Sequence, residues 1–260
     1  MTRLPFFQVD AFATRAFEGN PAAVIPLEQW LPDATLQAIA AENNLSETAF
    51  TVARSDGVAD YDLRWFTPTV EVDLCGHATL ASGHVLIGGE RISFATRSGV
   101  LTVTRDAGRL WLDLPALPVV EGEEPGLIDA LGTSGPVFLS REGNGAAIVL
   151  LPDEAAVRGV APNFAALRRI DRLVIVTAPG TETAIVSRVF AAYHGIDEDP
   201  VTGSAHAALV PLWAARLECD GFTALQASRR SGRLECRLKG DRVLLGGGAV
   251  TTIEGFFLLP

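Results

Sequence analysis

The sequence predicts an α+β protein made of two similar halves, each mostly β-strand around one long alanine-rich helix. Short motifs recur in the same order in both halves, and most apolar stretches alternate like strands. The chain has 260 residues, of which 48% are hydrophobic and 20% charged. A chain of this size buries on the order of 70% of its surface on folding, which is sufficient for a sizeable core.

The internal repeat is the main argument for two halves. Residues 18–24 (EGNPAAV) recur as 142–148 (EGNGAAI), and four further matches follow in register. They pair 63–66 with 187–190, 75–78 with 202–205, 97–101 with 230–234, and 109–112 with 242–245. The spacing grows slowly from 124 to 133 residues, as small loop insertions would produce. A proline- and glutamate-rich stretch near 115–126 predicts a linker, which gives an N-terminal lobe 1–118 and a C-terminal lobe 119–260.

The elements of one half can be predicted from pattern. Alternation predicts a strand at 7–12, and a short apolar run predicts another at 22–25. Asp33 is the expected N-cap of a helix over 33–42 that stops at Asn43 and Asn44. A second helix is expected over about 76–86. The other strands of this half are expected at 49–53, 62–66, 100–104 and 110–114.

Composition excludes several classes of protein. The formal net charge of −10 and pI near 4.9 argue against binding to a nucleic acid. No apolar run approaches the ~18–20 residues of a membrane-spanning helix. Cys75, Cys219 and Cys236 form no CxxC pair, which is typical of reduced thiols in a cytoplasmic protein. His84, His194 and His206 lack metal-ligand spacing, so we expect no metal. Gly246–Gly248 lacks the GxGxxG pattern, so we expect no cofactor.

The two matched helix starts are the most informative segments. DLCGHAT (73–79) and DPVTGSA (199–205) both place a glycine and small residues where a helix begins. Free backbone N–H groups and the helix dipole at such a start bind a carboxylate or phosphate, and two starts facing each other across a pseudo-twofold cleft would hold a small anion. The alternative is two capped helices whose glycines only ease packing. His77 favours the first interpretation, because a cap needs no histidine.

Glu47 is the candidate acid/base. It follows the predicted helix stop and opens an apolar strand, so its carboxylate is expected at the entrance of a buried strand, a setting suited to general acid/base catalysis. A solvated turn glutamate is the alternative, since charged residues are mostly exposed.

These segments resemble the PhzF-like phenazine-biosynthesis family, relatives of diaminopimelate epimerase. The resemblance covers nearly the whole chain and is carried by FQVDAF (7–12), GNPAAV (19–24), NLSETAF (44–50), CGHAT (75–79) and DPVTGSA (199–205). It implies a diaminopimelate epimerase-like fold of two pseudo-symmetric lobes, each a β-barrel-like sheet around a central helix, with the active site between them. It also implies an isomerase without cofactor that is commonly a homodimer.

The resemblance assigns roles to individual residues. Glu47 would be the acid/base residue, and His77, Asp199 and Ser204 would bind the substrate and assist proton movement. The backbone at Gly76 and Gly203 would hold a carboxylate, with Cys75 and Thr202 beside it. Epimerases of this kind use one thiol on each side of the substrate, whereas here Cys75 is matched by Thr202, whose hydroxyl is far less acidic than a thiol.

One-base chemistry led by Glu47 on a small cyclic carboxylate is therefore the preferred function. Two alternatives stay open: an amino- or imino-acid epimerase or dehydratase using Cys75 and Thr202, and a protein that only captures a small ligand. The sequence does not identify the substrate or the pathway.

Overall fold

Two compact units divide the chain in the computed structural model. Unit 1 comprises residues 1–114 and 246–260, and unit 2 comprises residues 115–245. The structure describes residues 1–140 and 145–259, so residues 142–144 of the second repeat copy lie outside the described part.

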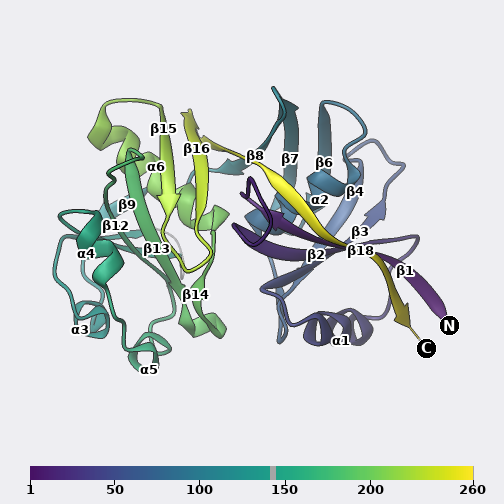
Figure 1. The fold of residues 1–260 in the computed structure, drawn as a ribbon, viewed down its shortest axis with the longest axis horizontal. Coiled ribbons are helices and arrows are strands. Elements are labelled where there is room, and N and C mark those ends of the chain that lie inside the picture. Colours follow the sequence, from purple (N-terminus) through teal and green to yellow (C-terminus); the bar gives the residue numbers. More distant parts are fainter. Residues whose placement is uncertain (141–144, 260) are drawn as a thin grey trace. The chain divides into compact units, whose positions relative to one another are not determined.

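The two units contain the following elements, shown in Figure 1. Unit 1 is built from β1 (Thr2–Ala11), β2 (Asn20–Leu27), α1 (Asp33–Asn43), β3 (Glu47–Ala53), β4 (Tyr61–Phe66), β5 (Glu71–Val72), α2 (Gly76–Leu86), β6 (Arg91–Thr96), β7 (Gly99–Asp106), β8 (Arg109–Pro115) and β18 (Ala249–Leu259). Unit 2 is built from β9 (Val119–Glu121), α3 (Leu127–Leu131), β10 (Val137–Ser140), β11 (Ala146–Leu150), α4 (Glu154–Gly159), α5 (Phe164–Leu167), β12 (Leu173–Pro179), β13 (Ile185–Ala191), a 3₁₀ turn (Ala192–His194), β14 (Ile196–Asp199), α6 (Gly203–Leu217), β15 (Gly221–Gln226), β16 (Gly232–Lys239) and β17 (Arg242–Gly247).

Strand pairing follows the same plan in both units. In unit 1, β2 pairs parallel with β3, β3 antiparallel with β4, β4 parallel with β6, and β6 antiparallel with β7. In unit 2, β11, β12, β13, β15 and β16 repeat this series of parallel and antiparallel pairs in the same order. The repeat seen in the sequence is therefore a repeat of topology.

The chain-terminal strand of the second half joins unit 1. The strand β9, by contrast, pairs with β10 inside its own unit 2. The chain-terminal strand β18 returns to pair with β1 along its whole length in unit 1 (Figure 1, yellow beside purple). The compact units consequently differ from the halves 1–118 and 119–260 in this terminal segment, because strand pairing and not chain order decides which unit β18 joins.

The central helix α2 of unit 1 is buried over most of its length, from Gly76 to Gly83. It packs against β1, β2, β3 and β7. Its alanines and glycines allow this close approach: a Cβ added at Gly83 would lie 2.7 Å from Cγ1 of Val103. On the side of α1, a second core includes Leu36, Phe50 and Phe66. The rings of Phe50 and Phe66 meet edge to face with centroids 5.6 Å apart.

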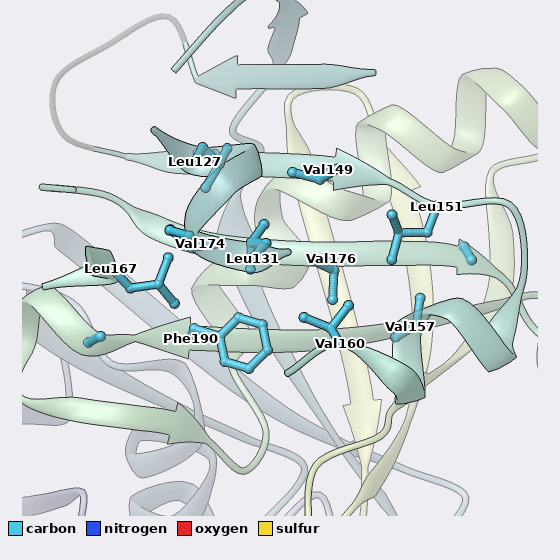
Figure 2. Close-up of a cluster of buried hydrophobic side chains, with 14 of the residues drawn as sticks. Leu127, Leu131, Val149, Leu151, Val157, Val160, Leu167, Val174, Val176 and Phe190 are labelled. Atoms are coloured by element: carbon cyan, nitrogen blue, oxygen red, sulfur yellow. The ribbon is translucent and has the colours of Figure 1, made fainter. Parts of the chain in front are cut away.

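A separate apolar cluster lies over the sheet of unit 2 (Figure 2). Leu127 and Leu131 of α3 pack against strands β11, β12 and β13, with Phe190 fully buried among them. Short helices thus cover this side of the sheet in unit 2, whereas the longer helix α1 covers the sheet in unit 1.

Most predicted elements of the first half are confirmed, with two corrections. The predicted helices 33–42 and 76–86 correspond to α1 and α2, and Asn44 ends α1 in the left-handed conformation at φ 50°. Asp33 is not the N-cap, however: Pro32 occupies that position, and the Asp33 carboxylate accepts a hydrogen bond from Arg64 instead. Strands β5 and β6 were not predicted. No helix in the described residues is long and apolar enough to span a membrane.

Candidate active site

Glu47, Cys75 and His77 lie together in unit 1. Glu47 is the first residue of β3, Cys75 is the N-cap of α2, and His77 is in the first turn of that helix. The parallel pair β2 and β3 holds Glu47 opposite Ala22. The His77 Nε2 atom is 3.1 Å from the Glu47 Oε2 atom, and the His77 Nδ1 atom is 3.6 Å from the Cys75 Sγ atom. The imidazole therefore lies between the carboxylate and the thiol.

Asn20 is the fourth member of this cluster. It is fully buried at the start of β2, and its amide Nδ2 lies 3.1 Å from Nδ1 of His77. The sequence repeat includes Asn20, but sequence reasoning assigned it no role. An amide next to one ring nitrogen fixes the orientation of the imidazole and leaves the other nitrogen directed at Glu47.

Burial and charge set the protonation of the cluster. Burial, reinforced by the negative charge of Glu47, raises the pKa of the Cys75 thiol to about 11, so the thiol is neutral at neutral pH. Burial alone would lower the pKa of His77, but its contacts with Cys75 and with Glu47 outweigh burial and raise this pKa well above its usual value. The cluster therefore favours the protonated form of His77.

Glu47 is only partly buried. Its side chain is 13% exposed, against 4% for His77. The Oε2 atom of Glu47 and the Nε2 atom of His77 are close enough for an ion pair but are not aligned for a hydrogen bond. A carboxylate that is held near a buried cation while one edge reaches solvent can accept and return a proton.

The corresponding region of unit 2 contains a different polar network. Asp199 ends β14, and Thr202 is the N-cap of α6. The Thr202 hydroxyl donates a hydrogen bond to the Asp199 carboxylate. Gln226, fully buried at the end of β15, accepts from the Thr202 N–H at 2.9 Å and donates to the Asp199 carbonyl oxygen at 2.8 Å. It also donates to the Thr202 hydroxyl at 3.1 Å. Gln226 thus fixes the loop before α6, and no sequence signal identified it.

Both central helices begin without a capping side chain. Cys75 and Thr202 make no side-chain hydrogen bond to the first turn of their helices, so neither competes for the backbone N–H groups there. Gly76 and Gly203 follow as buried first residues, and Ser204 is partly exposed. Anion binding at each helix start, which would use these N–H groups, stays a prediction.

A serine ties down the loop before each helix. Ser98 donates its hydroxyl to the Asp73 carbonyl oxygen at 2.7 Å in unit 1. Ser228 donates to the Pro200 carbonyl oxygen at 2.8 Å in unit 2. The two loops are held in a similar way by residues that the repeat does not match, since Ser98 aligns with Ser231.

The chemistry of the two units is nevertheless unequal. Glu47 pairs with Ala22 across the parallel strands of unit 1, and Leu173 pairs with Ala146 at the same place in unit 2. The acid/base position of one unit is thus apolar in the other. Cys75 is matched by Thr202, which is already committed to Asp199 and Gln226. Among residues 1–140 and 145–259, only unit 1 has a carboxylate, an imidazole and a thiol together at the start of its central helix.

His206 in unit 2 stands where unit 1 has Thr79. Its Nδ1 donates to the Thr202 carbonyl oxygen at 2.8 Å, where Thr79 in unit 1 donates its hydroxyl to the Cys75 carbonyl oxygen at 2.5 Å. Burial lowers the pKa of His206 to about 4, so it is neutral at neutral pH. It fastens the helix start and is not a candidate acid/base residue.

Comparison with known proteins shows which family this chain resembles along its length. The family model described as phenazine biosynthesis-like protein, PhzC-PhzF, matches residues 9–255. An uncharacterized isomerase of Pseudomonas aeruginosa is 50% identical, over 97% of this chain and 98% of that protein. An uncharacterized isomerase of Halalkalibacterium halodurans is 44% identical over the full length of both chains.

Solved structures agree on the fold. The crystal structure of a phenazine biosynthesis protein of the PhzF family from Enterococcus faecalis has a TM-score of 0.91 and 44% identity, covering 99% of this chain and all of that one. A probable proline racemase from Agrobacterium radiobacter, at 13% identity and a TM-score of 0.63, shares the fold alone. The predicted diaminopimelate epimerase-like fold of the α+β class is confirmed.

Proposed function

We propose that this chain, which belongs to the phenazine biosynthesis-like family PhzC-PhzF, is an isomerase that moves a proton within a small cyclic carboxylate, with Glu47 as the acid/base residue. The observation that carries the proposal is the pairing of a partly exposed Glu47 carboxylate with the buried His77 imidazole at 3.1 Å. A carboxylate in this position can take a proton from carbon and return it to a neighbouring atom.

The other residues have supporting roles in this proposal. The His77 cation compensates charge that develops on the substrate as the proton leaves. Asp199 and Ser204 bind polar groups of the substrate and assist proton movement, while the backbone at Gly76 and Gly203 binds its carboxylate. Cys75 and Thr202 shape the helix starts. Every step uses side chains and backbone of the chain itself, so the proposed reaction needs no cofactor.

The inequality of the units favours one-base chemistry over a two-base epimerase. The two-base epimerase alternative needs a base in unit 2 at the position matched to Glu47 or to Cys75. Leu173 occupies the position matched to Glu47, and the Thr202 hydroxyl already donates to Asp199. The Cys75 thiol has a pKa of about 11, so very little of the basic thiolate is present at neutral pH. Loss of turnover on alkylation of Cys75 alone, with Glu47→Gln still active, would favour the epimerase or dehydratase alternative.

Proton exchange in D₂O followed by NMR tests the proposal. The protein is incubated with a panel of small cyclic carboxylates, and deuterium incorporation and isomerised product are recorded for wild type, Glu47→Gln and Glu42→Gln. Glu42 is an exposed glutamate of α1 and serves as the matched control. We expect Glu47→Gln to lose about 10²–10⁴-fold in rate and Glu42→Gln to match wild type. Binding without exchange in wild type would instead support a capture protein.

We further propose a cytoplasmic homodimer. Cys75, Cys219 and Cys236 are free thiols, as in reducing compartments, and twofold dimers are the commonest assembly. Light scattering on the purified protein tests the dimer: the expected mass is twice 27.5 kDa, and a mass of 27.5 kDa would refute it.

A further inference from the structure

We propose that Glu47, Cys75 and His77 form a binding site for Zn²⁺ and similar thiophilic divalent cations, and that occupancy of this site blocks the carboxylate. The three residues each offer one ligand atom, and these atoms lie within 4.8 Å of one another. The metal binding stands independently of the proposed function, whereas the inhibition rests on it.

The donor set matches zinc in number and in kind. Three protein ligands with a fourth position open is the usual arrangement of accessible zinc sites, and sulfur, imidazole nitrogen and carboxylate oxygen are its three common ligands. The separation of 3.1 Å between Glu47 Oε2 and His77 Nε2 is close to the distance between two ligands of a tetrahedral zinc ion. The thiol selects against Mg²⁺ and Ca²⁺, which prefer oxygen ligands.

Two unsatisfied atoms are directed into the same space. Glu47 Oε2 and His77 Nε2 are both buried and both lack a hydrogen-bond partner, although they are 3.1 Å apart. A cation between them would bind the Glu47 oxygen and, once His77 has released its proton, the lone pair of Nε2. Buried polar atoms without a partner are uncommon in folded proteins, and a bound ion is one of the ordinary explanations.

The surroundings fit a metal-bound imidazole. When one ring nitrogen binds a metal, the other usually donates its proton to an amide, carboxylate or carbonyl oxygen. Asn20 lies 3.1 Å from Nδ1 of His77 and provides such an oxygen when its amide turns over. Nε2, beside the Glu47 carboxylate, is therefore the metal-binding nitrogen, and the Cys75 side chain must turn from Nδ1 toward the ion. The three ligand atoms already lie within 4.8 Å of one another, so the movement is small.

Sequence spacing gave no indication of this site, because the ligands do not form a local motif. Cys75 and His77 are two residues apart at the start of α2, but Glu47 lies on β3, 28 residues before Cys75. Strand β3 and helix α2 bring them together.

Titration with Co²⁺ tests the site without measuring activity. A cobalt–thiolate bond gives a charge-transfer absorption that oxygen and nitrogen ligands alone do not. Wild type, Cys75→Ser, Glu47→Gln and Cys219→Ser are titrated, and Zn²⁺ is then added in competition. Cys219 is an exposed free thiol and provides the matched control. A second readout is the shift in melting temperature with Zn²⁺ and with Mg²⁺.

We expect one Co²⁺ per chain, displaced by Zn²⁺, with an unchanged band in Cys219→Ser. Cys75→Ser is expected to lose the band, and Glu47→Gln to bind at least tenfold more weakly. Zn²⁺ should raise the melting temperature of wild type, whereas Mg²⁺ should not. The proposal is overturned if the band survives in Cys75→Ser, if it is lost in Cys219→Ser, or if Glu47→Gln binds as tightly as wild type.

The functional consequence is distinguishable from the proposed function itself. If Glu47 is the acid/base residue, Zn²⁺ at the Co²⁺-displacing concentration abolishes proton exchange by wild type. If the metal binds but exchange continues unchanged, the site stands and the assignment of Glu47 fails. If exchange depends on Glu47 but no metal binds, the proposed function stands and the metal site fails.

Discussion

Replacing Gln226 by leucine is the sharpest test of how the loop before α6 is held. Gln226 is fully buried and makes three hydrogen bonds, to the Thr202 N–H, the Thr202 hydroxyl and the Asp199 carbonyl oxygen. Leucine fills a similar volume but provides none of them. A buried donor left without its acceptor costs ~1–3 kcal/mol, and each of the other two bonds contributes about 1 kcal/mol.

We therefore expect Gln226→Leu to lower the free energy of unfolding by about 3–5 kcal/mol, measured by urea denaturation. The melting temperature should fall by roughly 6–20 °C for a chain of this length. Thr223→Val, at an exposed position on the same strand, is the control and should stay within about 0.5 kcal/mol of wild type. A loss below about 1 kcal/mol in Gln226→Leu would refute the reasoning.

Two further predictions concern the helices. Gly83→Ala places a Cβ 2.7 Å from Val103 and should cost about 1–3 kcal/mol in unfolding free energy, part of which Val103→Ala should restore in the double variant. No recovery in the double variant would contradict the close-packing explanation. Burial holds the pKa of His206 at about 4, below its unfolded value of ~6.5, so the unfolded chain binds this proton first as the pH falls. Stability should therefore drop by about 3 kcal/mol between pH 6.5 and pH 4, and His206→Gln should remove that part of the pH dependence in denaturation curves. An unchanged pH profile in His206→Gln would show that other groups cause it.

The fold was largely predictable because its signals are local and duplicated. Alternating apolar residues identified β1, the spacing of apolar residues placed α1, and the predicted bounds of α1 and α2 are close to the observed ones. The return of β18 to β1 was not predictable, since nothing in residues 249–259 says which partner strand they meet. The N-cap at Pro32 was missed because the long-range contact of Asp33 with Arg64 outweighs its local capping preference.

The candidate site was predictable only where a motif marks it. Glu47, Cys75 and His77 lie in conspicuous segments, and the structure brings these three together. Asn20 and Gln226 were missed for different reasons. Asn20 lies in the motif 18–24, which served as evidence for the repeat and so suggested no role at the site. Gln226 ends an ordinary strand and contacts Thr202 only in the tertiary fold.

The fate of the transferred hydrogen tests the central claim, one-base chemistry at Glu47, most directly. A substrate found in the exchange panel is deuterated at the carbon that loses its proton and converted in H₂O, and the product is analysed by NMR. A single carboxylate that takes and returns the same hydrogen predicts that part of the deuterium appears at the new position and that Glu47→Gln forms almost no product. A product that carries only solvent hydrogen, formed at the wild-type rate by Glu47→Gln, would contradict the account.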